Sequence, residues 1–270
     1  MSSKQKQILL TNDDGIGSPG LWAAAEVLSE LGYVTVAAPR EHSSATGRSF
    51  PKHSDGKITS QKMEVNGQSW EVYAVGGTPS QTTLHALLEI LPQKPDLVVA
   101  GINYGENLSC DITFSGTVGG AMEAASLGIP AMATSLQILK EDWDTYHKDV
   151  DFSTAAYFTK YFAKLLLEKH MLPDVDLFNL CIPVNATPQT PWRLTCLAKT
   201  RYFNPYVIRS GAGTWQDEGY ITSHANVPPD LPSNTDVHTL INETLVSLTP
   251  LSLDLTSRVD FQELNKLLRE

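Results

Sequence analysis

The sequence lacks the features of a disulfide-rich or membrane protein. Only three of its 270 residues are cysteines, Cys110, Cys181 and Cys196, and they lie far apart. An odd number of widely spaced cysteines argues against a disulfide framework and against the paired spacing of a structural zinc site. No apolar run approaches the roughly 18 residues of a membrane span. We therefore expect a soluble, cytoplasmic protein with reduced thiols and no membrane partner.

Concentrated positive charge is also absent. The chain has 30 acidic and 20 basic residues, a net charge of −10, and no dense lysine and arginine cluster. Binding to a nucleic-acid polymer requires such a cluster, so we expect no partner of that class. A small anion stays compatible with this composition if a metal ion or backbone amides supply positive charge. The 41% hydrophobic content suffices for one large core with a smaller appendage.

The first 38 residues have the pattern of a βαβ unit. Residues 7–11 predict a buried strand, and residues 33–38 predict a second one. Between them, Ser18 and Pro19 are typical of a helix N-cap and first helical position, and apolar residues recur on one helical face to about residue 31. Gly32 fits a helix end. A βαβ unit implies a parallel sheet.

Later segments continue this α/β alternation, with two additions. Strands are predicted at 96–100, 129–135 and within 176–184, helices at 79–91, 117–127 and 151–170, and a long polar loop at 101–116. Asn66-Gly67 predicts a β-hairpin inserted over about 57–75 that can project from the sheet. Residues 188–232 lose periodicity, which indicates irregular strands or an arm, and a strand at 245–248 and a helix at 259–269 follow.

These patterns predict an α/β core over residues 1–187 and an extended β arm with a C-terminal helix over 188–270, within one domain overall. The apolar face of residues 259–269 needs a partner surface. We therefore expect the arm and the helix to serve oligomerisation, as a homodimer or homotetramer.

The first predicted strand is followed by two carboxylates, Asp13 and Asp14, and then by glycines spaced G-x-G-x-x-G over residues 15–20. This spacing, with Glu41 further on, matches a dinucleotide-binding fingerprint. The two carboxylates, however, repel a pyrophosphate unless a cation lies between them. Adjacent carboxylates suit Mg²⁺, Mn²⁺ or Ca²⁺, and Asn-Asp-Asp-Gly is also ordinary turn chemistry.

Neutral polar residues follow two neighbouring strands. Asn103 comes just after the strand at 96–100, and Ser43 and Ser44 follow the strand at 33–38. In open α/β sheets, ligands bind outside the carboxyl ends of the strands, where the strand order reverses. Oxygens of Asn103 and a serine would thus complete a hard-cation site, although loop capping explains each residue separately.

A second polar stretch, Ser115-Gly116-Thr117, begins a predicted helix. Free backbone N–H groups and the positive end of the helix dipole would face a phosphate there. No lysine follows as in a P-loop, and close helix packing explains the small residues equally well.

Several longer runs occur in a fixed order along the chain. They are L-T-N-D-D-G at 10–15, A-P with S-A-T-G within 38–47, G-G-T-P at 76–79, P-D-L-V-V-A-G-I-N-Y-G-E-N at 95–107, S-G-T-V-G-G-A-M-E at 115–123 and V-S-L-T-P-L at 246–251. In the sequence and order of these runs, the chain resembles the SurE (survival protein E) family of metal-dependent nucleotidases. The resemblance spans most of the sequence.

The resemblance implies a Rossmann-like, mostly parallel sheet flanked by helices, a β-rich extension and subunits that associate through exchanged arms. It implies a 5′-nucleotidase that hydrolyses nucleoside monophosphates to nucleoside and phosphate, with 3′-nucleotides and short polyphosphates as further substrates. It also implies one divalent ion per subunit, Mg²⁺ or Mn²⁺ with Ca²⁺ as another occupant. The ligands implied are Asp13, Asp14, Ser44 and Asn103.

The resulting hypothesis is metal-assisted hydrolysis of a phosphomonoester. Asp13 or Asp14 would act as general base, and Asn107 with Ser115, Gly116 and Thr117 would stabilise the oxyanion charge. His238, close to Asp236 in the sequence, is a candidate proton donor because such pairs orient an imidazole. An ordinary surface or core histidine is the alternative at this position.

The chain departs from the usual family pattern after Pro39, where Arg-Glu-His replaces the common Asp-Arg, at Gln81-Thr82, and before residues 246–251. These changes bear on substrate preference. Three rival functions stay open: a nucleotide-dependent oxidoreductase using the glycine loop, a haloacid-dehalogenase-type phosphatase, and a non-catalytic regulator that binds a nucleotide through the same metal. The adjacent aspartates differ from the D-x-D spacing of the second.

Overall fold

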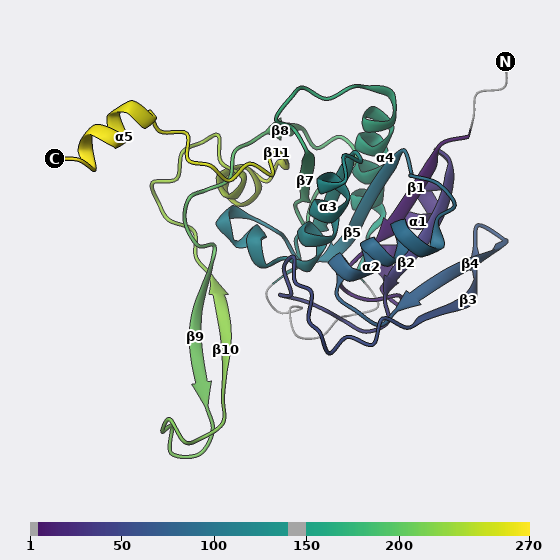
Figure 1. Cartoon of the computed structure of the whole chain (residues 1–270), viewed down its shortest axis with the longest axis horizontal. Helices are drawn as coiled ribbons and strands as arrows, with labels where there is room; N and C mark the ends of the chain where they lie inside the picture. The colour runs from purple at the N-terminus through teal and green to yellow at the C-terminus, as the bar shows by residue number, and fades with distance from the viewer. Residues whose placement is uncertain (1–4, 140–149) are drawn as a thin grey trace.

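The centre of the molecule is a sheet of nine strands within residues 5–139 and 150–270, the part of the chain that this computed structural model describes (Figure 1). In spatial order the strands are β3 (Ile58–Val65), β4 (Gln68–Val75), β2 (Tyr33–Pro39), β1 (Gln7–Thr11), β5 (Leu97–Tyr104), β6 (Ala131–Leu136), β7 (Leu177–Ile182), β11 (Val246–Leu251) and β8 (Trp192–Leu194). From β4 to β7 all neighbouring strands are parallel. The predicted α/β fold with a mostly parallel sheet is confirmed.

Helices cover both faces of this sheet (Figure 1). On one face lie α1 (Pro19–Leu28) and α4 (Ser153–Glu168), and on the other lie α2 (Pro79–His85), which continues as η1 (Ala86–Ile90), and α3 (Gly116–Ser126). Alternation along β1 sends Ile8 and Leu10 toward α1 and α4 and sends Leu9 toward α3. Because both faces are buried, the central strands are mostly apolar, and several of their polar residues, such as Thr134 and Asn179, are themselves buried.

Helix α1 begins as the sequence predicts but ends earlier. Ser18 is its extended N-cap residue and Pro19 its first residue, while the last helical residue is Leu28 rather than residue 31. Gly32 does not end the helix. A Cβ at this position would overlap the carbonyl oxygen of Lys6, so the glycine permits a close approach to the chain entering β1.

The predicted hairpin is formed by β3 and β4, with Val65 opposite Gln68. Asn66 has φ +50° and Gly67 has φ +71°, as a type I′ turn requires. The hairpin does not stand away from the sheet, because β4 pairs in parallel with β2 through Ala37 and Tyr73. It therefore extends the sheet by two strands.

The predicted polar loop at 101–116 is largely regular structure. β5 continues to Tyr104 after a register shift between Ala100 and Asn103. A 3₁₀ helix, η2 (Ser109–Phe114), then leads into α3. The sequence misled here because buried Ile102 lies among glycine and polar residues that weaken the strand pattern.

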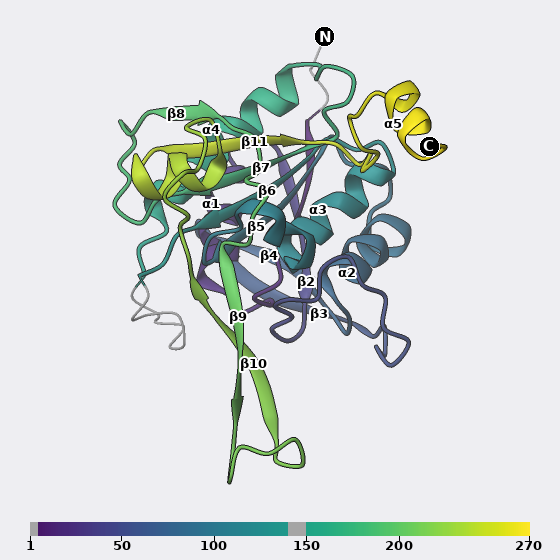
Figure 2. The ribbon, with the colours of Figure 1, turned by 90° about the vertical axis from the view of Figure 1, so that its left-hand side faces the viewer.

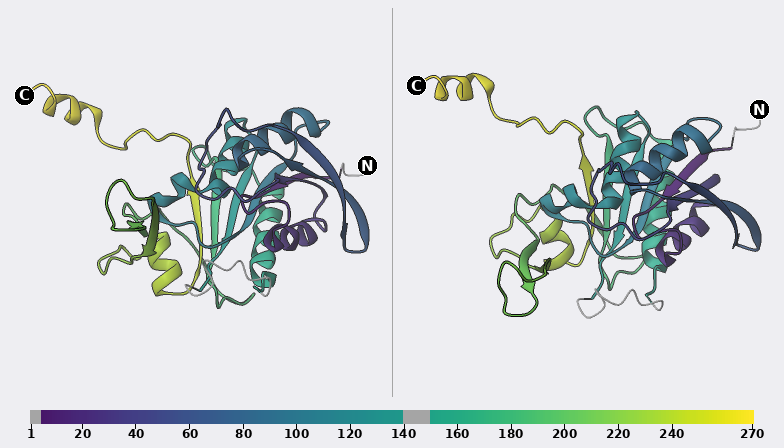
Figure 3. Two further views of the ribbon diagram at one scale, coloured as in Figure 1. Left: turned by 90° about the horizontal axis from the view of Figure 1, so that it is seen from below. Right: turned by 60° about the horizontal axis from the view of Figure 1, so that its bottom comes forward.

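The C-terminal part of the chain is divided between the sheet and two projections. β8 and β11 belong to the main sheet, whereas β9 (Phe203–Arg209) and β10 (Gly219–Ala225) form a separate antiparallel hairpin that extends from the body (Figure 2). Helix α5 (Phe261–Leu267) also extends away and has no buried residue (Figure 3). The division into a core over 1–187 and an arm over 188–270 stays a prediction, although two strands after residue 187 lie in the main sheet.

Candidate metal and phosphate site

The predicted site residues meet where the strand order reverses. From β1 the chain builds outward through β2 on one side and then returns to β5 on the other. Loops leaving two adjacent parallel strands therefore diverge at this point and leave a crevice at their carboxyl ends. Asp13 and Asp14 follow β1, and Asn103 lies near the end of β5.

Two of the glycines after β1 are required by the backbone conformation and by close packing. Gly15 has φ +93°, and the side-chain amide of Asn12 donates to its carbonyl oxygen at 2.9 Å and accepts from its N–H at 3.2 Å. A Cβ at Gly20 would overlap the carbonyl oxygen of Ile102, so this glycine lets α1 pack on β5. Gly17 has open space around it. The turn thus explains Gly15 and helix packing explains Gly20, whereas nothing around Gly17 requires a glycine.

Asp13 is buried against the start of α3. Its carboxylate accepts a hydrogen bond from the Thr117 hydroxyl, and a Cβ at Gly116 would lie only 2.8 Å from the Asp13 Cβ. Burial raises the pKa of Asp13 to about 6, while the Thr117 hydrogen bond acts in the opposite direction. An anionic Asp13 therefore needs a nearby positive charge to offset its desolvation.

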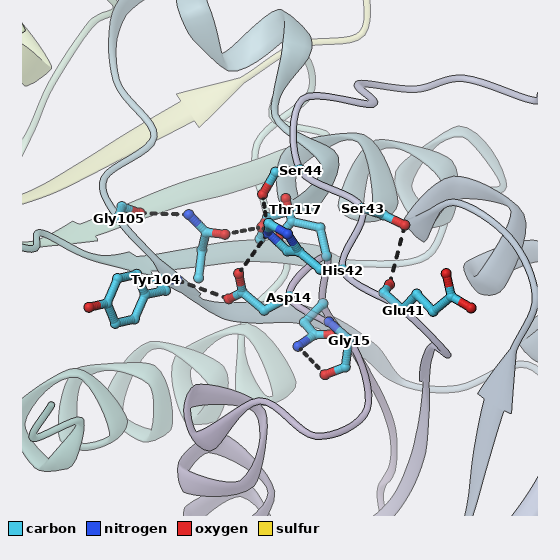
Figure 4. Close-up of polar contacts among 12 residues, drawn as sticks. Asp14, Gly15, Glu41, His42, Ser43, Ser44, Tyr104, Gly105 and Thr117 are labelled. Atoms are coloured by element: carbon cyan, nitrogen blue, oxygen red, sulfur yellow. Dashed lines mark hydrogen bonds and ion pairs between the residues drawn. The ribbon is translucent and has the colours of Figure 1, made fainter. Parts of the chain in front are cut away.

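Asp14 lies beside Asp13, and its side chain is almost fully buried. Its Oδ2 accepts from the backbone N–H of Tyr104 at 3.0 Å (Figure 4). On its other side, Nε2 of His42 lies 3.7 Å from Oδ1 of Asp14 and 2.5 Å from Oγ of Ser44. Partial burial lowers the pKa of His42. The loop after β2 thus brings His42 close to Asp14 and places Ser44 in the cavity that Asp13 also lines.

One hydroxyl group stands between two acceptors in the middle of the cluster. Oγ1 of Thr117 lies in hydrogen-bond contact with Oδ1 of Asp13 and 3.1 Å from Oδ1 of Asn103. The Asn103 amide nitrogen donates to the Gly105 carbonyl at 2.7 Å, which fixes the amide orientation. A hydroxyl has one proton, so it cannot donate to both oxygens at once. This surplus of oxygen acceptors favours a cation.

The donor set fits a hard divalent ion. Two carboxylates, one hydroxyl and one amide oxygen are the ligands that Mg²⁺, Mn²⁺ and Ca²⁺ take in proteins. Within residues 5–139 and 150–270, no group of three or more histidine, cysteine, aspartate or glutamate side chains is placed to hold a metal ion. The candidate donors include only two such side chains, Asp13 and Asp14, because the other two donors are the neutral oxygens of Ser44 and Asn103.

Asn107 has a fixed backbone and an unused side-chain donor. Its N–H donates to Ser135 Oγ at 3.3 Å, and its carbonyl accepts from the Asn179 amide at 2.8 Å and from the Cys181 thiol at 2.9 Å. Burial raises the pKa of Cys181 to about 12, so the sulfur keeps its proton. In contrast, the Asn107 Nδ2 group is buried and has no hydrogen-bond partner among the described residues. Such a donor is suited to an anion.

A cavity of about 260 Å³ joins these groups. Asp13, Ser44, Asn103, Asn107 and Ser115 line one part of it, and Tyr104, Glu106, Phe114, Phe203 and Ser223 line other parts. The Ser115 oxygen also caps α3 by accepting from the Val118 N–H at 3.2 Å. Gly116 and Thr117 do not line the cavity themselves but pack on Asp13. Another cavity, of about 230 Å³, lies at the opposite ends of β6 and β7, away from the predicted residues.

The predicted pairing of Asp236 with His238 is wrong. Asp236 is buried and accepts from the backbone N–H groups of Ser109, Ala198 and Val237. The ion-pair neighbour of His238, in η4 (His238–Asn242), is Glu243 at 3.7 Å. Nor does His238 line the cavity. Nearness in sequence misled because the Asp236 carboxylate is needed to satisfy three backbone donors.

The fold and the site define a Rossmann-like α/β protein with a cluster of carboxylates and neutral oxygens at the switch in strand order. The family model described as "Survival protein SurE" matches residues 8–204. The chain therefore belongs to the survival protein SurE family.

Similar proteins cover nearly the whole chain. The 5′-nucleotidase SurE of Methanosarcina acetivorans is 40% identical over 268 residues, with 97% of each chain covered. That of Methanocella arvoryzae is 38% identical over 268 residues, with 98% of each covered. A crystal structure of the SurE protein from Aquifex aeolicus is similar with a TM-score of 0.74 and 30% identity, covering 97% of this chain and 99% of that one. The fold predicted from the sequence motifs is the fold of this family.

Among the described residues, no helix has both the length and the apolar composition needed to cross a membrane.

Proposed function

We propose that this protein is a metal-dependent 5′-nucleotidase that hydrolyses nucleoside monophosphates to nucleoside and phosphate. The observation that carries the proposal is the surplus of oxygen acceptors around Thr117, next to the unpartnered Asn107 amide in the same cavity. The first feature favours a divalent cation and the second favours a phosphate oxygen. The names of the full-length relatives, 5′-nucleotidase SurE, support the same reaction.

In this proposal Asp13, Asp14, Ser44 and Asn103 hold one divalent ion, which when bound supplies Lewis acidity toward a phosphate oxygen and water. Mg²⁺ or Mn²⁺ is the proposed ion, with Ca²⁺ as another occupant. Asp13 or Asp14 accepts the proton of the attacking water. The close packing of both carboxylates against backbone and hydroxyl groups fixes their orientation before substrate binds.

The phosphate is proposed to lie between the carboxylates and the start of α3. The Asn107 Nδ2 group would donate to a phosphate oxygen. The Ser115 oxygen accepts from Val118, which leaves the hydroxyl proton available for a second phosphate oxygen. Gly116 and Thr117 contribute by letting the helix begin directly against Asp13. Donors fixed in this way stabilise charge that develops on the phosphoryl oxygens.

Finer features belong to the same proposal. Action on 3′-nucleotides and short polyphosphates, and a cytoplasmic location, stay predictions from the sequence. We also propose a homodimer or homotetramer. Its support is the exposure of apolar side chains on both projections, namely Trp215, Tyr220 and Ile221 on or near the hairpin and Leu267 and Leu268 at the end of the chain.

The direct test is phosphate release from a panel of 5′- and 3′-nucleoside monophosphates and tripolyphosphate, with EDTA and after adding back Mg²⁺ or Mn²⁺. We expect 5′-monophosphates to be hydrolysed only with metal. Turnover that is unaffected by EDTA, or no turnover with any ion, would refute the proposal. Nucleotide binding without phosphate release would indicate a regulator instead.

A further inference from the structure

The base of the β9–β10 hairpin takes part in the cavity, although most of the hairpin extends away from the body (Figure 2). Phe203, the first residue of β9, and Ser223 of β10 line the same cavity as Asp13 and Asn103. A segment without clear periodicity in the sequence therefore supplies one wall of the candidate site.

Phe203 is held against η2, the short helix that follows the loop with Asn107. The backbone N–H groups of Tyr202 and Phe203 donate to one oxygen of Asp111, at 2.9 and 2.7 Å. The two rings meet edge to face, with centroids 4.7 Å apart. These contacts fix the position of the Phe203 ring before any ligand arrives.

Glu106 reinforces this attachment. The Tyr202 hydroxyl donates to Glu106 Oε1 at 2.8 Å, and both side chains are buried. Because Glu106 precedes Asn107 directly, the hydrogen bond joins the hairpin base to the proposed phosphate-binding loop. The hairpin base and the loop that carries Asn107 are consequently packed together on two sides of the cavity.

Several residues that line the cavity differ chemically from the oxygen donors of the proposed metal site. They include two phenylalanines, Phe114 and Phe203, and the hydroxyl residue Ser223, and no lysine or arginine is among the described residues that line the cavity. This composition does not fit a second phosphate. It fits a flat, uncharged group with apolar faces and polar edges.

We propose that Phe114 and Phe203 form the nucleobase-binding wall of the site, with Ser223 next to the polar edge of the nucleoside. The inference rests on the proposed nucleotidase function and deepens it, because it states which part of the substrate each wall contacts. Phe114 immediately precedes Ser115, so the base and phosphate contacts come from adjacent residues. Since every base has a π face, this wall distinguishes nucleotides from sugar phosphates more than one base from another.

The test compares AMP with ribose 5-phosphate in the parent protein and in Phe203→Ala and Phe114→Ala variants. We expect kcat/KM for AMP to fall about 5- to 150-fold, mainly through KM, as for loss of one base-stacking contact. Ribose 5-phosphate hydrolysis should change by less than about twofold. Tyr206→Ala is the matched control, because Tyr206 is an exposed aromatic residue of the same strand that does not line the cavity.

A second measurement does not depend on hydrolysis. Adenosine binding to each folded protein is followed by saturation-transfer NMR, and Phe203→Leu, which keeps apolar volume, replaces the alanine variant if that variant does not fold. Weaker adenosine binding in the Phe203 and Phe114 variants supports the proposal that these two residues contact the nucleobase. An unchanged preference for AMP over ribose 5-phosphate, or adenosine binding equal to that of the parent, overturns it. Failure of the parent to release phosphate refutes the nucleotidase function while the adenosine result still decides the base site.

Discussion

The ends of β1 and β5 differ sharply from the outer β9–β10 hairpin in the type of side chain and in its exposure to solvent. At the strand ends, Asp13 and Asn103 are buried, the side chain of Asp14 is almost fully buried, and each has a specific hydrogen-bond partner. On and beside the hairpin, Trp215, Tyr220 and Ile221 are exposed apolar groups. Burying polar groups is unfavourable without partners, whereas exposing apolar groups is unfavourable without a cover. This contrast fits the small polar ligand proposed for the strand ends and the subunit interface proposed for the hairpin.

The largest effect should come from removing a carboxylate at the strand ends, compared with the same substitution at an exposed position outside the candidate site. Asp14→Asn removes a carboxylate from the proposed metal site, and we expect kcat/KM for AMP to fall by at least about 10³-fold, since a bound metal is worth several kcal/mol in the transition state. Asp230→Asn, at an exposed position before η4, is the matched control and should leave kcat/KM unchanged. Equal activity of the two variants in a phosphate-release assay contradicts the assignment.

A smaller loss is expected from Asn107→Ala. Removal of one oxyanion donor lowers the rate about 10²-fold. Because the Nδ2 group has no hydrogen-bond partner in the part of the chain that the structure describes, the free energy of unfolding should not decrease. Kinetics and urea unfolding of the same preparation check both expectations. A variant that loses stability and activity together would make Asn107 a structural residue.

The residues of the candidate site also show what can be predicted from the sequence. Asp13, Asp14, Asn103 and one of the serines 43 and 44 could be predicted as a group because the ends of neighbouring parallel strands must meet. The family resemblance then singled out Ser44. Phe203 could not be predicted. Its place in the cavity depends on hydrogen bonds to Asp111, far away in sequence, and no local pattern encodes such a contact.

The same limit explains the two local errors. The end of β5 is buried through long-range pairing with β6 that its glycine and polar residues conceal. Asp236 lies two residues before His238, but its carboxylate satisfies backbone donors from Ser109 and Ala198, in segments distant along the chain. In both cases a tertiary contact outweighed the local pattern.

The buried carboxyl group of Glu106 makes stability depend on pH at the junction between the two regions. Burial raises the pKa of Glu106 above its ordinary value of 4.5. The stability associated with the protonated form is therefore fully present below pH 4.5 and is lost as the pH rises through the higher, folded-state pKa. Glu106→Gln keeps an acceptor for Tyr202 and does not titrate. We expect this variant to gain stability relative to the parent between pH 4 and pH 7 in urea unfolding. A difference that does not change with pH contradicts this account.

The smallest effect on the folded subunit should come from removing α5. None of its residues is buried, so truncation after Thr256 should change the free energy of unfolding of the subunit by less than about 0.5 kcal/mol. The mass in solution should nevertheless decrease by more than the deleted residues, as light scattering after gel filtration will measure. An unchanged number of subunits would remove α5 from the proposed interface.

The central claim is that Asp13, Asp14, Ser44 and Asn103 hold one divalent ion. Calorimetric titration with Mn²⁺ tests it most directly in the parent, in Asp13→Asn and in the exposed control Asp230→Asn. The account predicts one ion bound per chain in the parent and the control, and binding weakened by at least about tenfold in Asp13→Asn, because one of the two anionic ligands is lost. Equal Mn²⁺ affinity and stoichiometry in all three proteins would contradict it.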